Sequence, residues 1–372
     1  MTAFPETVLQ FGTGRFLRAF ADRFIHQANV EGQNIGSVVV VQSTGSEEAD
    51  KLNAAKGVYH IAVRGLEDGQ IVRRDEVASV SRALAAGREW KEILKVACSS
   101  DLRFILSNTT EKGYEHDLNE APDRIPPQSF PAKLTSVLRA RFLAGKLGVT
   151  VIPCELIDNQ ADQLLGIIVK FAEAWRLPSD FVKWVRQECV WLNTLVDRIV
   201  VGPPSDHPLA GKDQLLIMAE PFAFWALQER AGAFPFVKNR AIVRTADVRP
   251  YFLRKVRILN AAHTALVTRA RPKGHSTVLE AMQDAELADW LERLLFEEIV
   301  PTIQKQVDDA TGFARHTLER FRNPFLAHKI DDILKNHPDK VRIRLLPTRE
   351  EFRRLRGSEP KLLNDVLKAN GL

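Results

Sequence analysis

A lysine, an asparagine and a histidine stand close together in residues 255–263, which read Lys-Val-Arg-Ile-Leu-Asn-Ala-Ala-His. The surrounding residues 250–269 begin at a proline, contain no glycine and are rich in Leu, Val, Ala and Arg, so we expect one helix there. At about 100° per residue, His263 lies about 80° and Asn260 about 140° around the helix axis from Lys255. The three polar groups therefore share one side of the predicted helix.

These three groups suit chemistry at an alcohol or a carbonyl. A lysine or a histidine can give or take a proton, and an asparagine amide can donate to an oxygen that becomes negatively charged. Val256 and Leu259 fall within the same arc and make its surroundings partly apolar. The alternative is that a surface lysine, a capping asparagine and a core histidine share a helix by chance, and the spacing leaves both interpretations open.

The composition is that of a globular protein with room for two domains. With 372 residues, 45% of them hydrophobic and 27% charged, the chain can bury a sizeable core. No apolar run is long enough to span a bilayer, and residues 1–5 do not begin a signal peptide, so we expect no membrane association. Cys98, Cys154 and Cys189 are widely spaced and odd in number, which favours free thiols and a cytoplasmic location.

The charge and the spacing of Cys and His residues indicate which kinds of ligand the protein binds. The net charge of +5 is spread along the chain without a nucleic-acid-binding motif, which favours an anionic small substrate over nucleic acid. No Cys/His pair has the spacing of zinc ligands, so we predict no metal. A monomer or a small homo-oligomer is expected.

Strands and helices alternate over residues 1–159. The pattern predicts strands at 7–11, 37–42, 58–64, 70–81, 102–106 and 148–153, and helices at 15–29, 90–97 and 129–142. Later helices are expected at 161–175, 179–190, 250–269, 276–283, 288–307 (broken near Pro301) and 311–320, with a small sheet of strands 215–218 and 241–244. We therefore predict an α/β protein with a Rossmann-like, doubly wound sheet domain at 1–159 and a mostly α-helical substrate domain at 160–372.

The first predicted strand leads directly into Gly12-Thr13-Gly14 and then into a helix. Gly12 permits the tight turn and Gly14 lets the backbone approach a pyrophosphate at the helix N-terminus. Leu17 stands where the third glycine of the dinucleotide pattern would be, so a purely structural turn is the alternative. Arg18 adds a cation near the expected phosphate. The candidate contacts here are Phe11, Gly12, Gly14, Arg15, Phe16 and Arg18.

Two further loops follow strand ends, where ligands bind in doubly wound sheets. The second strand ends in Gln42-Ser43, with neither an acid for the ribose of NAD nor an arginine for the 2′-phosphate of NADP, so NAD is expected and NADP stays the alternative. After the strand at 102–106, the polar loop at 107–113 resembles a ligand rim. The candidate cofactor contacts in these loops are Ser43, Thr109, Thr110 and Glu111.

Seven segments in order along the chain carry a family resemblance. They are residues 10–19, 107–113, 129–135, 154–159, 195–199, 255–263 and 320–324. Together they resemble the polyol-specific long-chain dehydrogenases and reductases, also called the mannitol dehydrogenase family. The amino-acid sequence at 107–111, 129–135 and 320–325 is most similar to that of the hexuronate branch, whose members reduce tagaturonate and fructuronate.

The resemblance implies a metal-independent hydride transfer between NAD(P) and a hexuronate ketone, tagaturonate being converted to altronate. Fructuronate reductase, mannitol 2-dehydrogenase and mannitol-1-phosphate 5-dehydrogenase activities are the alternatives, the last because the chain is nearer that enzyme's length. A non-catalytic nucleotide-binding sensor is the alternative of a different class. It is disfavoured because all the catalytic residue types are present.

Within this resemblance Lys255 is the general acid/base, with its pKa lowered by burial. Asn159 and Asn260 would hydrogen-bond the developing alkoxide, and His263 would orient the substrate. Asp197 would contact substrate hydroxyls or hold a cationic side chain, with an ion pair to Arg198 or another surface base as the structural alternative.

A sugar acid also needs a partner for its carboxylate. Arg320 is the family-matched candidate, because a guanidinium can bind a carboxylate through two hydrogen bonds. His328 is expected to be a further substrate contact. His328 and the neighbouring Lys329 could equally be solvated side chains on a C-terminal helix.

Overall fold

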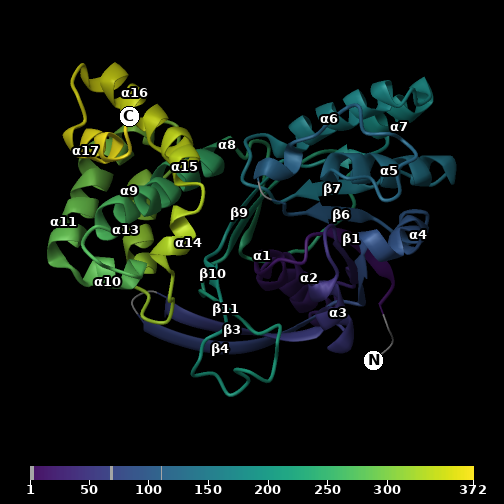
Figure 1. Ribbon diagram of the computed structural model, residues 1–372, viewed down its shortest axis with the longest axis horizontal. Coiled ribbons are helices and arrows are strands. Elements are labelled where there is room, and N and C mark those ends of the chain that lie inside the picture. The colour runs from purple at the N-terminus through teal and green to yellow at the C-terminus, as the bar shows by residue number, and fades with distance from the viewer. Residues whose placement is uncertain (1–3, 68–69, 110) are drawn as a thin grey trace. The chain divides into compact units, whose positions relative to one another are not determined.

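The computed structural model describes residues 4–67, 70–109 and 111–372, which form two compact units (Figure 1). The first unit comprises Met1–Ala62, Asp75–Ala219 and Ala223–Val248, and the second comprises Val63–Arg74, Glu220–Phe222 and Arg249–Leu372. This division differs from the predicted boundary between residues 159 and 160. The chain beyond Asn159 continues the first unit because it supplies another strand and two covering helices to the same sheet.

A six-stranded parallel sheet forms the centre of the first unit. Its strands, from one edge to the other, are β5 (Arg82–Ala85), β2 (Ser37–Gln42), β1 (Glu6–Phe11), β6 (Phe104–Ser107), β7 (Thr150–Pro153) and β8 (Val190–Trp191). Numbered along the chain, this order is 3-2-1-4-5-6, that of dinucleotide-binding sheets. The predicted Rossmann-like sheet is confirmed. The strand order reverses at β1 and β6, where such sheets bind their ligands.

Helices cover both faces of this sheet. They are α1 (Arg15–Ala19), α2 (Ala21–Val30), α3 (Glu47–Ala54), α4 (Ala86–Ala97), α5 (Phe130–Leu143), α6 (Gln160–Ala174) and α7 (Ser179–Gln187), with a short 3-10 turn, η1 (Glu111–Tyr114). Figure 1 shows α1 and α2 on the opposite side of the sheet from α6 and α7. Alternate strand residues such as Leu9, Val39 and Ile105 pack against α4, α5, α6 and α7, because successive side chains of a strand point to opposite faces.

The single helix predicted at 15–29 is broken in the structure. Phe20 separates α1 from α2 with φ −127° and ψ −84°. Its ring is fully buried and lies 5.0 Å from the ring of Phe16 and 5.1 Å from that of Trp225. Aromatic packing against a distant strand accompanies the break, and no sequence signal such as Gly or Pro marks it.

The remaining strands form two smaller sheets. One contains β10 (Val200–Val201), β11 (Ile217–Ala219), β3 (Val58–Glu67) and β4 (Gln70–Ser79), and the other contains β13 (Ile242–Thr245), β12 (Phe224–Gln228) and β9 (Thr194–Asp197). The prediction that 215–218 and 241–244 share a sheet is wrong. The strand at 242–245 pairs instead with β12, an apolar strand absent from the prediction.

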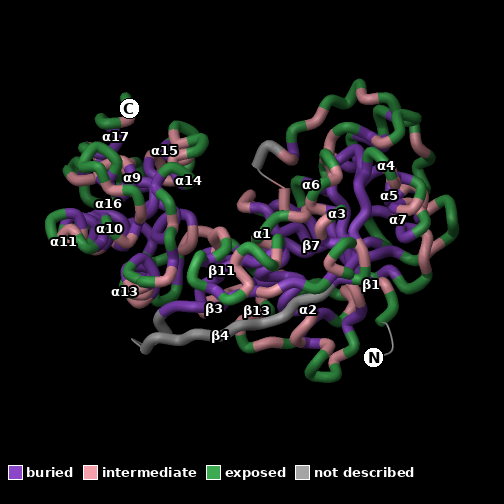
Figure 2. The backbone as a smooth tube through the Cα atoms, turned by 60° about the horizontal axis from the view of Figure 1, so that its bottom comes forward, coloured by how far each residue is buried: buried purple, intermediate pink, exposed green. Residues whose placement is uncertain are grey.

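The second unit is mostly helical, as predicted. Its helices are α8 (Arg249–Arg254), α9 (Ala261–Ala270), α10 (Val278–Gln283), α11 (Ala285–Arg293), α12 (Val300–Ile303), α13 (Ala310–Phe321), α14 (Ile330–Leu334), α15 (His337–Arg344), α16 (Leu346–Arg356) and α17 (Lys361–Ala369), with π-helical turns η2 (Lys255–Asn260) and η3 (Leu294–Ile299). Helix α9 is largely buried and contacts α10, α11, α14, α15 and α17 (Figure 2). The helix predicted at 288–307 is interrupted by η3 just before Pro301, whose nitrogen has no hydrogen to donate to the preceding turn.

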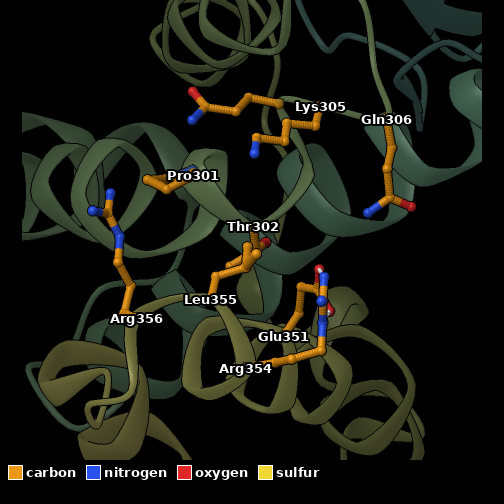
Figure 3. A pocket seen from close by; sticks show the side chains of 9 residues that line it. Pro301, Thr302, Lys305, Gln306, Glu351, Arg354, Leu355 and Arg356 are labelled. Carbon is orange, nitrogen blue, oxygen red and sulfur yellow. Dashed lines mark hydrogen bonds and ion pairs between the residues drawn. The ribbon is translucent and has the colours of Figure 1, made fainter.

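A surface groove of about 580 Å³ lies in the second unit. It is formed by α12, the turn that follows it and α16 (Figure 3). Arg354, which lines the groove, is committed to Glu351 through hydrogen bonds of 2.9 and 2.6 Å. Among the described residues that line this groove, none is one of the predicted site residues.

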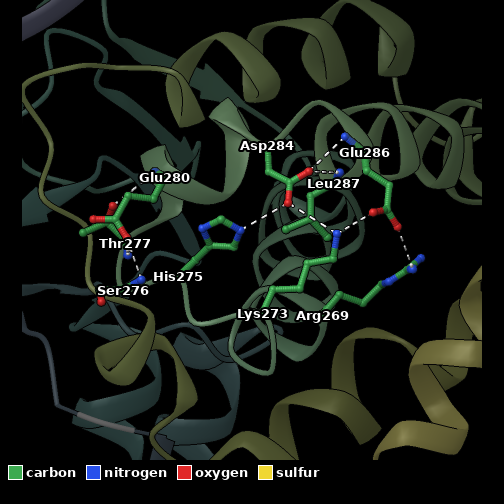
Figure 4. A network of polar contacts seen from close by, with 9 residues as sticks. All are labelled: Arg269, Lys273, His275, Ser276, Thr277, Glu280, Asp284, Glu286 and Leu287. Carbon is green, nitrogen blue, oxygen red and sulfur yellow. Dashed lines mark hydrogen bonds and ion pairs between the residues drawn. The ribbon is translucent and has the colours of Figure 1, made fainter.

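A polar network joins the end of α9 to α10 and α11 (Figure 4). Thr277 and Glu280 form a reciprocal capping box at the start of α10, and the Asp284 side chain accepts from two backbone amides at the start of α11. Lys273 Nζ lies 3.3 Å from the Asp284 carboxylate and 2.6 Å from that of Glu286. These contacts set where each helix begins and so anchor the C-terminal end of α9.

Candidate active site

The two glycines after β1 have different structural roles. Gly12 has φ +129°, and a Cβ there would lie 3.1 Å from the carbonyl oxygen of Asn108. Both the backbone conformation and the close approach therefore require glycine. Gly14 caps α1, and a Cβ there would meet nothing within 4 Å. The turn thus presents an open stretch of backbone at Gly14, as the approach of a pyrophosphate requires.

Side chains around this turn are arranged differently from the prediction. Phe11 is fully buried, with its ring 5.4 Å from that of Phe130, so only its backbone can face a ligand. Arg15 is exposed and Phe16 is half-buried.

The Arg18 guanidinium makes contacts within the protein. The side chain is buried, Nε donates to the Thr13 carbonyl (3.2 Å) and Nη1 donates to the Leu215 carbonyl (2.9 Å). Nη2 lies 3.6 Å from the Glu48 carboxylate, and burial lowers the pKa of the guanidinium. Arg18 thus supports the glycine turn from within the protein, and its contact with a phosphate stays a prediction.

A buried carboxylate not singled out by the sequence organises the loop after β6. Glu155 accepts from the Thr109 amide (2.9 Å), the Ser107 hydroxyl (3.1 Å) and the Tyr114 hydroxyl (3.3 Å). Burial raises the pKa of Glu155, while these hydrogen bonds act in the opposite direction. A Cβ at Gly113 would clash with the Thr109 side chain, so any other residue there would force that side chain to move.

This network accounts for Ser107, Thr109 and Gly113 in the loop, and Glu155 lies in the matching segment 154–159. Thr109 is held by Glu155, Glu111 begins the turn η1, and Thr110 lies outside the described residues. Ser43 is half-buried directly after β2. Glu47 and Glu48 follow it in the first turn of α3.

The helix expected at 250–269 is three helical segments rather than one. Residues Lys255–Asn260 form the π-helical turn η2 between α8 and α9, so the spacing of about 100° per residue does not hold there. Such turns interrupt α-helices frequently at functional sites. Lys255 is half-buried on this turn, and Asn260, at its last position, is buried.

Asn260 and His263 each have a buried nitrogen without a hydrogen-bond partner within the described part of the chain, namely Nδ2 of Asn260 and Nε2 of His263. A buried polar atom without a partner carries a free-energy penalty of about 1–3 kcal/mol, which a bound ligand can relieve. These two atoms are therefore candidate ligand contacts, and both were predicted from the sequence.

His263 lies against two other rings. Its imidazole stacks on Phe321 with centroids 4.0 Å apart and meets His328 edge-on at 4.9 Å. Burial lowers the pKa of His263 well below its usual value, and nearby His328, Arg320, Arg344 and Lys340 lower it further. Burial also lowers the pKa of His328 to about 4. Both imidazoles are therefore neutral near pH 7, and each can donate one hydrogen bond and accept another.

Arg320 is committed to a partner within the protein. Its Nε and Nη2 donate to the two carboxylate oxygens of Glu220 at 2.9 and 2.6 Å, and both side chains are buried. Its guanidinium carbon lies 4.3 Å from the centre of the Phe222 ring. Glu220 occupies the edge of the guanidinium formed by Nε and Nη2, and the role of Arg320 as a substrate contact stays a prediction.

Asn159 and Asp197 belong to the first unit, whereas Lys255, Asn260, His263 and His328 belong to the second. Asn159 is exposed with φ +48° at the start of α6, and Asp197 is buried at the end of β9. Nη1 of the neighbouring Arg198 donates to the carbonyl of Ala19 (2.6 Å). The roles of Asn159 and Asp197 stay predictions.

The described residues are 4–67, 70–109 and 111–372. They contain no group of three or more His, Cys, Asp or Glu side chains that could hold a metal ion. None of the helices they form is long and apolar enough to cross a membrane. Cys98, Cys154 and Cys189 are free cysteines.

Comparison with known proteins agrees with this architecture. The mannitol dehydrogenase Rossmann domain matches residues 6–236, and the mannitol dehydrogenase C-terminal domain matches residues 247–367. Altronate oxidoreductase of Halalkalibacterium halodurans is 38% identical over 375 residues, covering 96% of this chain and 73% of that protein. The altronate oxidoreductase of Bacillus subtilis is 35% identical over 377 residues, covering 97% of this chain and 78% of that protein.

Solved structures share the fold at lower identity. Pseudomonas fluorescens mannitol 2-dehydrogenase, in a ternary complex with NAD and D-mannitol, has a TM-score of 0.87 and 20% identity, covering 98% of this chain and 78% of that one. A D-sorbitol dehydrogenase has a TM-score of 0.81 and 22% identity, covering 99% of this chain and 80% of that one. The two domain matches and the relatives that span nearly the whole chain agree with a Rossmann-like first unit and a helical second unit, and the chain belongs to the mannitol dehydrogenase family.

Proposed function

We propose that the protein is an NAD-dependent oxidoreductase that interconverts tagaturonate and altronate. The relatives at 35–38% identity that span nearly the whole chain are altronate oxidoreductases. The structural observation that carries the proposal is the pair of unpartnered buried nitrogens, Asn260 Nδ2 and His263 Nε2, on the same helical stretch as Lys255.

The first unit has the features that NAD binding needs. The Gly12–Gly14 turn follows the central strand of a sheet with dinucleotide-binding order, and the backbone at Gly14 is open. Glu47 and Glu48 add negative charge just beyond Ser43, which disfavours the 2′-phosphate of NADP. When bound, NAD accepts or supplies the hydride. The residues that would hold it are the backbone at Gly12 and Gly14 and the loops at 43 and 109.

The second unit has the groups that handle the proton. In the reductive direction, the Lys255 ammonium donates its proton to the carbonyl oxygen as that oxygen becomes an alkoxide. The Asn260 amide donates a hydrogen bond to the same oxygen and stabilises its developing charge, a role that we also propose for Asn159. In the oxidative direction, neutral Lys255 takes the hydroxyl proton.

The histidine pair positions the sugar. Because burial keeps His263 neutral, its Nε2 can bind a substrate hydroxyl without competing with Lys255 for the transferred proton. His328, in edge contact with that ring, restricts its orientation. Asp197 is proposed as a further contact to hydroxyls. A cytoplasmic location and a monomeric or small homo-oligomeric state stay predictions.

The test is NADH oxidation by the purified protein with tagaturonate, fructuronate, fructose and fructose 6-phosphate offered in parallel. Rapid oxidation with tagaturonate alone is expected. Activity confined to fructose 6-phosphate would retain the lysine mechanism and reject the hexuronate substrate. No activity with any of the four, with NADH or NADPH, would favour the nucleotide-binding sensor.

A further inference from the structure

We infer that Glu155 positions the loop at the nicotinamide side of the cofactor site and, through its buried negative charge, favours NAD⁺ over NADH. This inference rests on the proposed binding of NAD at the Gly12–Gly14 turn. It names a residue to which neither the sequence patterns nor the comparisons assign a role in cofactor binding. Glu155 acts through the loop and through its charge, so it is a positioning residue.

The order of the strands indicates which half of the cofactor belongs over which strand ends. In sheets of this order the pyrophosphate lies at the turn after the first strand, and the adenosine ribose lies at the end of the second. Here these strands are β1 and β2, so we expect the nicotinamide half on the other side, over the carboxyl ends of β6 and β7 (Figure 1). Thr109 is the second residue after β6, and Glu155 is the second residue after β7.

Glu155 joins these two strand ends through four hydrogen bonds. One carboxylate oxygen accepts from the amide (2.9 Å) and the hydroxyl (3.2 Å) of Thr109. The other accepts from the hydroxyls of Ser107 (3.1 Å) and Tyr114 (3.3 Å). Because a backbone amide can only donate, its bond to Glu155 fixes the main chain of the loop at Thr109. Glu155 is 3% exposed, so water hardly competes for these bonds.

The same loop contacts the glycine turn. The Asn108 amide donates to the Phe11 carbonyl (3.1 Å), and a Cβ at Gly12 would lie 3.1 Å from the Asn108 carbonyl oxygen. Asn108 Nδ2 donates to the Cys154 carbonyl (2.5 Å). The backbone that Glu155 fixes therefore lies directly against the turn at which the pyrophosphate is proposed to bind.

The second effect of Glu155 is electrostatic. Burial raises the pKa of its carboxyl group, and the hydrogen bonds from Ser107 and Thr109 act in the opposite direction by stabilising the carboxylate. The nicotinamide ring carries a positive charge in NAD⁺ and none in NADH. A carboxylate at the ends of β6 and β7 therefore attracts the oxidised ring only, and its burial limits screening by water.

The consequence is a cofactor affinity that depends on the redox state. Removal of the charge should weaken binding of NAD⁺ more than binding of NADH, whereas a loosened loop should weaken both forms alike. The ratio of the two dissociation constants therefore separates the charge of Glu155 from its contribution to the structure of the loop.

The experiment measures the Kd of NAD⁺ and of NADH at pH 8 by isothermal titration calorimetry. Glu155→Gln removes the charge with little change in shape, and the ratio of Kd for NAD⁺ to Kd for NADH should rise about tenfold, as expected for the loss of one nearby charge of low exposure. Glu155→Asp shortens the side chain and keeps the charge, and the control Tyr114→Phe removes one donor and keeps the carboxylate. Both should weaken the two forms by similar factors, with a ratio within about twofold of the wild type.

Two outcomes would overturn the inference. The first is an unchanged ratio in Glu155→Gln, and the second is an equal rise of the ratio in Glu155→Asp or Tyr114→Phe. The thermal transition of every variant identifies loss of folding. If Glu155→Gln does not fold, the other two variants decide: unchanged affinity for both redox forms rejects the positioning role, and a shared loss supports it. A wild-type protein that binds neither NAD⁺ nor NADH would instead reject the proposed NAD site itself.

Discussion

The glycine turn of the first unit and the π-helical turn of the second unit make their sites in opposite ways. At Gly12 and Gly14 the missing side chains matter, because one position needs φ +129° and the other leaves its backbone open. At η2 the side chains matter, because Asn260 and the nearby His263 bring unpartnered polar nitrogens into a buried environment. Substitutions in the first region should therefore affect folding and NAD affinity, and those in the second should affect proton transfer and substrate binding.

The largest effect is expected at Lys255. Lys255→Ala should lower kcat by about 10²–10⁴-fold, because general acid/base catalysis contributes roughly that factor. NADH affinity, measured by fluorescence titration, should stay near the wild-type value because the cofactor features lie in the first unit. Substantial retained turnover would reject Lys255 as the general acid/base.

Substitution of Arg320 tests whether this residue stabilises the fold or binds the substrate. Arg320→Ala should destabilise the protein by about 3–5 kcal/mol, because it removes one half of a buried ion pair and leaves the negative charge of Glu220 buried. The double variant Arg320→Met with Glu220→Gln should regain most of that loss in urea denaturation. If Arg320→Ala instead unfolds like the wild type and raises only the KM for tagaturonate, Arg320 is a substrate ligand after all.

Substitution of Asp22 tests the buried hydrogen bonds that hold the glycine turn. Gln10 Nε2 donates to the Gly12 carbonyl (3.2 Å) and to the Asp22 carboxylate (3.4 Å), and burial raises the pKa of Asp22 to about 7. Between about pH 4 and pH 7 the folded protein keeps a proton that the unfolded chain has lost, so this group makes stability fall as the pH rises through that window and has no further effect above it.

The amide of Asp22→Asn does not titrate, so the variant stays neutral at this position at every pH. The variant should therefore be more stable than the wild type at pH 8, by up to about 4 kcal/mol, with the difference shrinking toward pH 4. Chemical denaturation at several pH values measures it. A difference that does not depend on pH would show that Asp22 titrates in the folded protein as it does in the unfolded chain.

The smallest effect is expected for alanine substitution of Gly12 and Gly14, which should differ in how they change stability. Gly12→Ala should destabilise the protein by about 1–3 kcal/mol, because alanine is strained at φ +129° and its Cβ would crowd the Asn108 carbonyl. Gly14→Ala should unfold like the wild type and weaken NADH binding only, since its Cβ meets no protein atom within 4 Å. Equal destabilisation by both would contradict the difference between a turn-forming and a ligand-facing glycine.

Several candidate site residues could be proposed from the sequence because their signals are local. A glycine pair directly after an apolar strand predicts a dinucleotide turn, and Lys255, Asn260 and His263 fall within nine residues of one another. Glu155 lay within a matched segment, but a lone glutamate has no pattern that marks it as a loop organiser.

The sequence by itself determined the alternation of strands and helices and the doubly wound sheet, because these depend on periodicity and on neighbours in the chain. The tertiary structure alone decided which charges are available. Arg320 meets Glu220 across 100 positions and Arg18 meets Leu215 across 197. The π-helical form of η2 was likewise beyond the sequence. Burial and long-range pairing decide whether a cation faces a ligand or a protein carboxylate, and neither is a property of local sequence.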